Sequence, residues 1–197
     1  MHRLWALVTD CGDAAVTLPL ALLVLVFLLA ARERLLALYW LLMVAGCAAA
    51  IGVLKLIFGA CGGRLETLEV ISPSGHTAMS TAIYGSLALL VAPSLPARWR
   101  PLVLAAAALL IAGIAISRVA LRFHDLPEVA LGLVIGIGAV AGFHAAMRRG
   151  AAPVLPVVWL MLAGLAVVAV MHGTRLNIEP GVRGLAGALR LSLPWCR

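Results

Sequence analysis

Six apolar stretches alternate with short polar breaks along this chain of 197 residues. They cover residues 14–31, 35–60, 76–92, 101–117, 127–147 and 153–172. Each is close to the roughly 20 helical residues that cross about 30 Å of hydrocarbon. Arginine pairs, glycines and prolines fill the breaks, as expected where apolar helices end. The pattern predicts an all-α membrane protein with six transmembrane helices in one bundle.

The remaining segments are short, so we expect a single domain over residues 1–197. Residues 1–13 then form an interfacial N-terminal segment, and residues 174–197 form a C-terminal tail. Within the fifth stretch, Gly132, Gly136 and Gly138 create a face of small residues. Such a face favours close helix packing. We expect that packing to occur within one chain. The oligomeric state, monomer or homodimer, stays open.

Composition supports the membrane interpretation. Hydrophobic residues make up 64% of the chain and charged residues 12%, against about half and about a quarter in soluble domains. The net charge of +7 is spread over short loops rather than one face. That distribution argues against a nucleic-acid partner and favours contact with membrane lipids.

The loop charges predict an orientation. The breaks after the first, third and fifth stretches are rich in arginine, with Glu33 as their one acid: Arg32, Arg34, Arg98, Arg100, Arg148 and Arg149. The opposite side carries most of the acids. Since short basic loops mark the cytoplasm, we expect a multi-pass protein of the inner (plasma) membrane whose active site faces the periplasm or outside.

The string Pro73-Ser74-Gly75-His76 opens the third stretch. A helix N-terminus presents free backbone N–H groups and a positive dipole end, which together bind anions. Gly75 allows close approach, Ser74 adds a hydroxyl, and His76 stands at the rim. The alternative is an ordinary N-cap followed by an interfacial histidine.

The second string is Ser117-Arg118, five residues, His124, three residues, Glu128. The spacing of four places His124 and Glu128 on one helical face. A carboxylate on one imidazole nitrogen fixes the tautomer and frees the other nitrogen to attack. Asp125 and Glu128 also fit a capping box at the start of the fifth helix. Both roles can coexist in one side chain.

These two strings resemble the second and third signature motifs of the type 2 phosphatidic acid phosphatase superfamily, also called lipid phosphate phosphatases. Two departures stand out. The family's first motif is a lysine, six residues and Arg-Pro, whereas Lys55 here precedes Arg64 by eight residues, without the proline. The usual aspartate at the end of the third motif is Glu128.

The resemblance implies a mechanism and no cofactor or metal. Phosphate oxygens would be held by Lys55, Arg64, Ser74, the Gly75 amide and Arg118. His124, oriented by Glu128, would attack phosphorus and form a phosphohistidine, while His76 would protonate the leaving oxygen. Cationic side chains would supply the positive charge that phosphoryl transfer needs.

The expected function is therefore the hydrolysis of a lipid phosphate or diphosphate. We rank undecaprenyl diphosphate first among its substrates, ahead of phosphatidylglycerophosphate and phosphatidate. Two alternatives stay open. One is a lipid phosphotransferase, acting for example on lipid A, and the other is a carrier that binds lipid phosphate without turnover.

Overall fold

The computed structural model describes the backbone of residues 2–65, 72–150 and 155–192, and the side chains of these except 62–65 and 191–192. Over these ranges the chain is helical and contains no strand. Its helices are α1 (His2–Asp10), α2 (Ala14–Ala30), α3 (Arg34–Leu65), α4 (Gly75–Val91), the 3₁₀ turn η2 (Ala92–Ser94), α5 (Arg100–Ala120), α6 (Leu126–Met147), α7 (Val157–Met171) and α8 (Glu179–Ser192).

Helices α2 to α7 lie where the six apolar stretches predict helices. Their starts follow from local chemistry. The Asp13 side chain accepts a hydrogen bond from the Ala15 N–H and caps α2, and Ser74 caps α4. Proline occupies the first turns of α5 and α6, where its missing N–H costs nothing. The sequence did not predict α1 as a helix.

Five segments of the described chain are long and apolar enough to cross a membrane: His2–Ala30, Arg34–Cys61, Gly75–Ser94, Arg100–Ala120 and Leu126–Met147. Helix α7 is apolar but shorter, with 15 residues. Large apolar side chains such as Leu109, Val134 and Leu165 point outward from the bundle. A continuous apolar exterior is what lipid contact requires. The protein is therefore a helical, multi-pass membrane protein.

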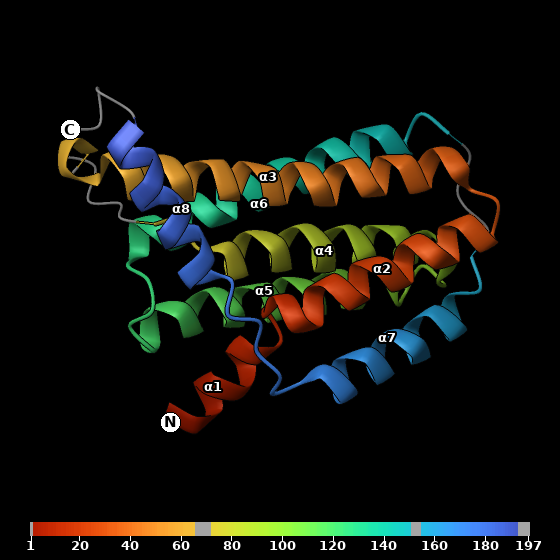
Figure 1. The fold of residues 1–197 in the computed structure, drawn as a ribbon. Helices are drawn as coiled ribbons and strands as arrows, with labels where there is room; N and C mark the ends of the chain where they lie inside the picture. The colour runs from red at the N-terminus through yellow and green to blue at the C-terminus, as the bar shows by residue number, and fades with distance from the viewer. Residues whose placement is uncertain (1, 66–71, 151–154, 193–197) are drawn as a thin grey trace.

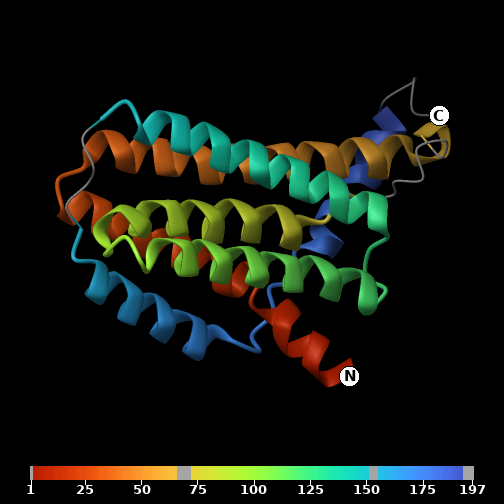
Figure 2. The ribbon, with the colours of Figure 1, turned by 180° about the vertical axis from the view of Figure 1, so that it is seen from behind.

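Helix α4 forms the centre of the bundle and packs against α2, α3, α5 and α6 (Figure 1). Helix α7 runs along the outside of α2, and α1 packs against α5. The reverse view shows α6 beside α3, with α4 and α5 below them (Figure 2). Helix α8 crosses α3 at the end of the bundle where α4 and α6 begin.

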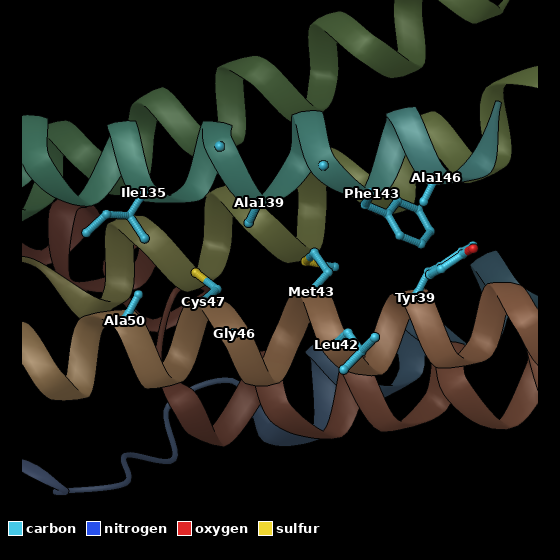
Figure 3. A pocket seen from close by; sticks show the side chains of 12 residues that line it. Tyr39, Leu42, Met43, Gly46, Cys47, Ala50, Ile135, Ala139, Phe143 and Ala146 are labelled. Carbon is cyan, nitrogen blue, oxygen red and sulfur yellow. The ribbon is translucent and has the colours of Figure 1, made fainter. Parts of the chain in front are cut away.

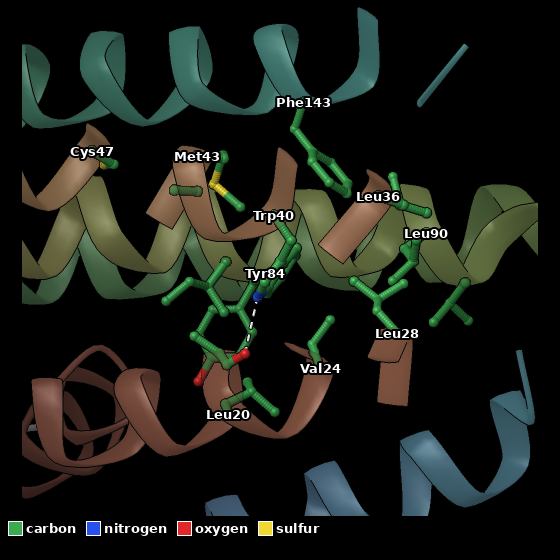
Figure 4. Packing of buried hydrophobic residues seen from close by; sticks show 14 of the residues in the cluster. Leu20, Val24, Leu28, Leu36, Trp40, Met43, Cys47, Tyr84, Leu90 and Phe143 are labelled. Atoms are coloured by element: carbon green, nitrogen blue, oxygen red, sulfur yellow. Dashed lines mark hydrogen bonds between the residues drawn. The ribbon is translucent and has the colours of Figure 1, made fainter. Parts of the chain in front are cut away.

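The core between α2, α3 and α6 is centred on Trp40, which is 1% exposed (Figure 4). Its ring meets Phe143 edge-on, with centroids 5.5 Å apart, and its indole N–H donates to the Ala21 carbonyl at 2.9 Å. A buried indole needs such a partner, because an unpaired N–H would be costly in an apolar environment. This contact fixes α3 against α2.

The contact between α4 and α6 is unusually close. A Cβ atom at Gly132 would lie 2.6 Å from the Ser74 carbonyl oxygen, and one at Gly136 would lie 2.5 Å from the Thr81 Cβ. The expected small-residue face therefore packs within one chain, through these two glycines. Gly138 has nothing within 4 Å at its Cβ position and does not take part.

Candidate active site

A cavity of about 810 Å³ lies at the end of the bundle where α4 and α6 begin and α5 ends. The α1–α2 junction, the middle of α3 and the first turn of α8 complete its wall. His76, Arg118, His124 and Glu128 line it together with Lys55. Residues from both sequence motifs, far apart along the chain, thus meet in one space.

His124 and Glu128 form the contact that their spacing predicts. The His124 Nδ1 lies 2.7 Å from Glu128 Oε2, and both side chains are nearly buried. Before His124 the chain turns through Arg122, whose φ of 56° lies in the left-handed region. The turn lets the His124 N–H reach back to the Arg118 carbonyl at 3.3 Å. Arg118 and His124 are therefore held next to each other.

Glu128 also binds the backbone. Its Oε2 accepts from the Asp125 N–H at 3.3 Å, which is the carboxylate half of the expected capping box. Its Oε1 accepts from the Ser72 N–H at 2.5 Å, and its own carbonyl accepts from the Ser74 N–H at 3.1 Å. One residue thus caps α6, contacts His124 and fixes the segment that leads into α4.

The environment of His124 favours its neutral form. Burial lowers the pKa of His124 below its ordinary value; the hydrogen bond to Glu128 opposes this shift, and the charges of Arg118 and Lys55 add to it. A neutral imidazole whose Nδ1 is occupied by Glu128 has its lone pair available at Nε2, as a nucleophile requires.

Lys55 reaches the cavity from α3, and its side chain is 12% exposed. Its Nζ lies 2.5 Å from Glu179 Oε2, at the first residue of α8. Burial raises the pKa of the Glu179 carboxyl, but the hydrogen bond and charge of Lys55 outweigh this and lower the pKa overall. The lysine expected to hold phosphate is thus paired with an acid of the chain itself.

Arg118 enters the cavity from the last turn of α5. Its guanidinium donates to the Thr9 hydroxyl at 3.2 Å and lies 4.6 Å from the centre of the Phe123 ring. Among the described residues, nothing accepts a hydrogen bond from its buried Nε. A buried guanidinium with spare donors suits an anionic ligand, which would accept from them.

The residues of the string Pro73-Ser74-Gly75-His76 have different roles: Ser74 is structural, whereas Gly75 and His76 line the cavity. The Ser74 side chain is fully buried and accepts from Thr77 as the N-cap of α4, and Ser74 is not among the lining residues. Gly75 does line the cavity, and a Cβ there would lie 3.8 Å from the Lys55 Cε. The predicted contact of Arg64 with phosphate concerns a side chain outside the described residues.

The cavity also contains charged residues that were not predicted to belong to the site, among them Asp10, Asp13, Arg175 and Glu179. His76 Nε2 lies 3.3 Å from Asp13 Oδ2, and Arg175 pairs with Asp10 at 3.0 Å. Nothing in the spacing of the sequence joins residues so distant along the chain. The acids at positions 10 and 13 beside an apolar helix were the available signal.

A smaller hollow of about 380 Å³ lies between α3 and α6 at the level of Cys47 and Phe143 (Figure 3). Its described lining contains no charged side chain. Because the described lining of this hollow offers no cation to bind phosphate, the larger cavity is the candidate site.

The chain matches a model of the PAP2 superfamily over residues 36–152, more than half its length. It belongs to the PAP2 superfamily. Members of this superfamily generally hydrolyse phosphate esters. A relative from Klebsiella pneumoniae, named "Uncharacterized 22.5 kDa protein in cps region", is 30% identical over 146 residues, which are 74% of this chain and 70% of the relative. No solved structure matches the chain.

Proposed function

We propose that this PAP2 protein is an integral membrane phosphatase that removes the terminal phosphate of a lipid phosphate or diphosphate through a phosphohistidine at His124. The observation that carries the proposal is the His124–Glu128 pair, 2.7 Å apart, in one cavity with Lys55, Arg118 and His76. This set combines a nucleophile, cations for the phosphate and a proton donor.

In the proposed reaction, His124 Nε2 attacks phosphorus and the bond to the lipid oxygen breaks. His76 gives its proton to that oxygen. Water then attacks the phosphohistidine, passes a proton to His76 and releases inorganic phosphate. A positioned proton donor contributes about 10²–10⁴ in rate.

Lys55, Arg118, the Gly75 amide and the predicted members Arg64 and Ser74 would hold the phosphate oxygens. Each charge-assisted hydrogen bond contributes roughly 1.5–3 kcal/mol. To bind phosphate, the Lys55 ammonium must first release the Glu179 carboxylate. Apolar side chains such as Leu18 and Met79 also line the cavity, which supports a phosphate attached to a lipid chain.

We further propose six membrane spans, with α7 as the sixth, and an active site on the non-cytoplasmic face of the inner membrane. Arg98 precedes the start of α5 and Arg148 follows the end of α6, whereas the cavity is lined by residues at the end of α5 and the start of α6. This placement supports the proposed orientation. Reporter fusions at these positions should report the cytoplasm.

Undecaprenyl diphosphate is our first-ranked substrate, followed by phosphatidylglycerophosphate and phosphatidate.

The direct test is a phosphate-release assay on purified protein in detergent, over a panel of lipid phosphates and with a chelator present. Wild type should release inorganic phosphate, and His124→Ala should lose activity by about 10³-fold or more while keeping its thermal stability. A requirement for added divalent metal would contradict the role of the cations. Transfer of phosphate to a second lipid instead of water would indicate a phosphotransferase.

A further inference from the structure

The contact between Asp13 and His76 joins the N-terminal part of the chain to the string Pro73-Ser74-Gly75-His76. Asp13 is 5% exposed and lies at the junction of α1 and α2. Its Oδ1 accepts from the N–H groups of Ala15 at 2.9 Å and Leu176 at 3.0 Å. Its Oδ2 lies 3.3 Å from His76 Nε2. The two oxygens therefore have separate partners.

Two backbone donors hold the carboxylate in place. The Ala15 bond ties it to α2, and the Leu176 bond ties it to the link between α7 and α8 (residues 172–178). Gly12 allows this close approach, because a Cβ there would lie 2.7 Å from Ile114 Cγ2 and 3.6 Å from His76 Cβ. With Oδ1 fixed, Oδ2 is directed at the imidazole without freedom to turn away.

To act as a proton donor, His76 must be positively charged, and the positive charges around it make a negatively charged partner necessary. Lys55 and Arg118 line the same cavity and disfavour a third positive charge there. Glu128 is occupied with His124 and two backbone donors. Among the described residues, Asp13 is the acid in contact with His76, and its negative charge opposes this repulsion.

We propose that Asp13 is the positioning residue for His76 as the proton donor, an inference that rests on the proposed phosphatase function. Asp13 accepts the Nε2–H of the imidazolium, which directs Nδ1–H to the leaving oxygen. When the phosphorus–oxygen bond breaks, the Nδ1 proton moves to that oxygen. Neutral His76 keeps its Nε2–H on Asp13, ready to accept a proton from water at Nδ1.

The test compares two substrates with leaving groups of different basicity. An alkyl phosphate expels an alkoxide that needs a proton, whereas p-nitrophenyl phosphate expels a stable phenolate that does not. Asp13→Asn removes the negative charge, but asparagine accepts hydrogen bonds and caps helices as well as aspartate. We expect kcat for the alkyl phosphate to fall by about 10²-fold, with little change for the nitrophenyl substrate.

His76→Ala should show the same dependence on the leaving group. Glu33→Gln removes one carboxylate at the far end of α2 and should leave both rates unchanged. If Asp13→Asn does not fold, Asp13→Ser, which also caps helices, provides the same comparison.

Equal losses of kcat on both substrates would assign Asp13 a structural role only, and unchanged rates on both would remove it from the mechanism. Either result overturns this inference and leaves the phosphatase proposal intact. Failure of the proposed function has a different signature, since wild type would then release phosphate from neither substrate.

Discussion

At the scale of single residues, Glu128 combines a proposed catalytic contact with contacts that hold the fold together. Its carboxylate contacts His124 and also accepts from the backbone of Asp125 and Ser72. The sequence predicted the first two contacts, because both depend on spacing within one helical turn. It could not predict the third, since Ser72 lies 56 residues away and meets Glu128 only after α4 and α6 pack.

Glu128→Gln separates these roles. Glutamine keeps one side-chain oxygen, which can accept from only one of the Ser72 and Asp125 N–H groups, and it loses the charge that fixes the His124 tautomer and stabilises its cationic form. We expect kcat to fall by about 10²-fold or more, with a loss of stability limited to about 1–3 kcal/mol for the backbone donor left unpaired. Phosphate release and thermal unfolding, measured on the same preparation, check this. Lower stability with an unchanged rate would leave Glu128 with the capping role alone.

The pKa of His124 predicts the acid side of the pH profile. The nucleophile must be neutral, so activity is present above its pKa and is lost as the pH falls through it. Because burial and nearby cations lower that pKa, half-maximal kcat/KM should lie below pH 6.5, the ordinary value for histidine. The phosphate group of the substrate also titrates. Its pKa, measured by phosphorus NMR in the same micelles, is used to correct the pH profile for this contribution. A midpoint at or above 6.5 would contradict this environment.

At the scale of helices, the glycines of α6 bring the two motifs together. Gly132 and Gly136 lie directly against α4, and this contact places Ser72 and His76 beside Glu128 and His124. The sequence indicated a small-residue face, but all three glycines looked equivalent there. Only the packed structure shows that Gly138 is open.

Gly136→Ala should therefore destabilise the protein. The added Cβ would lie 2.5 Å from Thr81 Cβ and 2.7 Å from the Ala78 carbonyl oxygen, so the helices must move apart. We expect a loss of about 1–3 kcal/mol in the free energy of unfolding and a fall in activity. Gly138→Ala is the matched control and should have no measurable effect. Equal melting temperatures for the two variants would refute the close packing.

Helix α8 contributes Glu179, whose contact with Lys55 would compete with phosphate in the proposed mechanism. Glu179→Gln keeps the shape of the side chain and removes its charge, which frees Lys55 for substrate. We expect KM for the lipid phosphate to fall by roughly tenfold, the equivalent of one charge-assisted hydrogen bond. Arg190→Gln, on the exposed side of the same helix, should leave KM unchanged. A higher KM for Glu179→Gln would mean that Glu179 holds Lys55 in place for phosphate.

At the scale of the whole molecule, the apolar pattern predicted the helical bundle because each lipid-exposed helix must be apolar along its own length. The C-terminal tail was less informative. Its glycines and scattered leucines favour a surface helix only weakly over a loose segment, and α8 packs on α3. The pairs Asp13–His76 and Lys55–Glu179 follow from that assembly, and local spacing carries no signal for them.

The central claim is that His124 becomes phosphorylated during turnover. The most direct measurement is a rapid alkaline quench of wild type mixed with lipid phosphate, followed by mass spectrometry of the peptide that contains positions 124 and 128. The account predicts a phosphoryl group on His124 that is stable to alkali, labile to acid and absent from His124→Ala. Phosphate on another residue, or full turnover by His124→Ala, would contradict it.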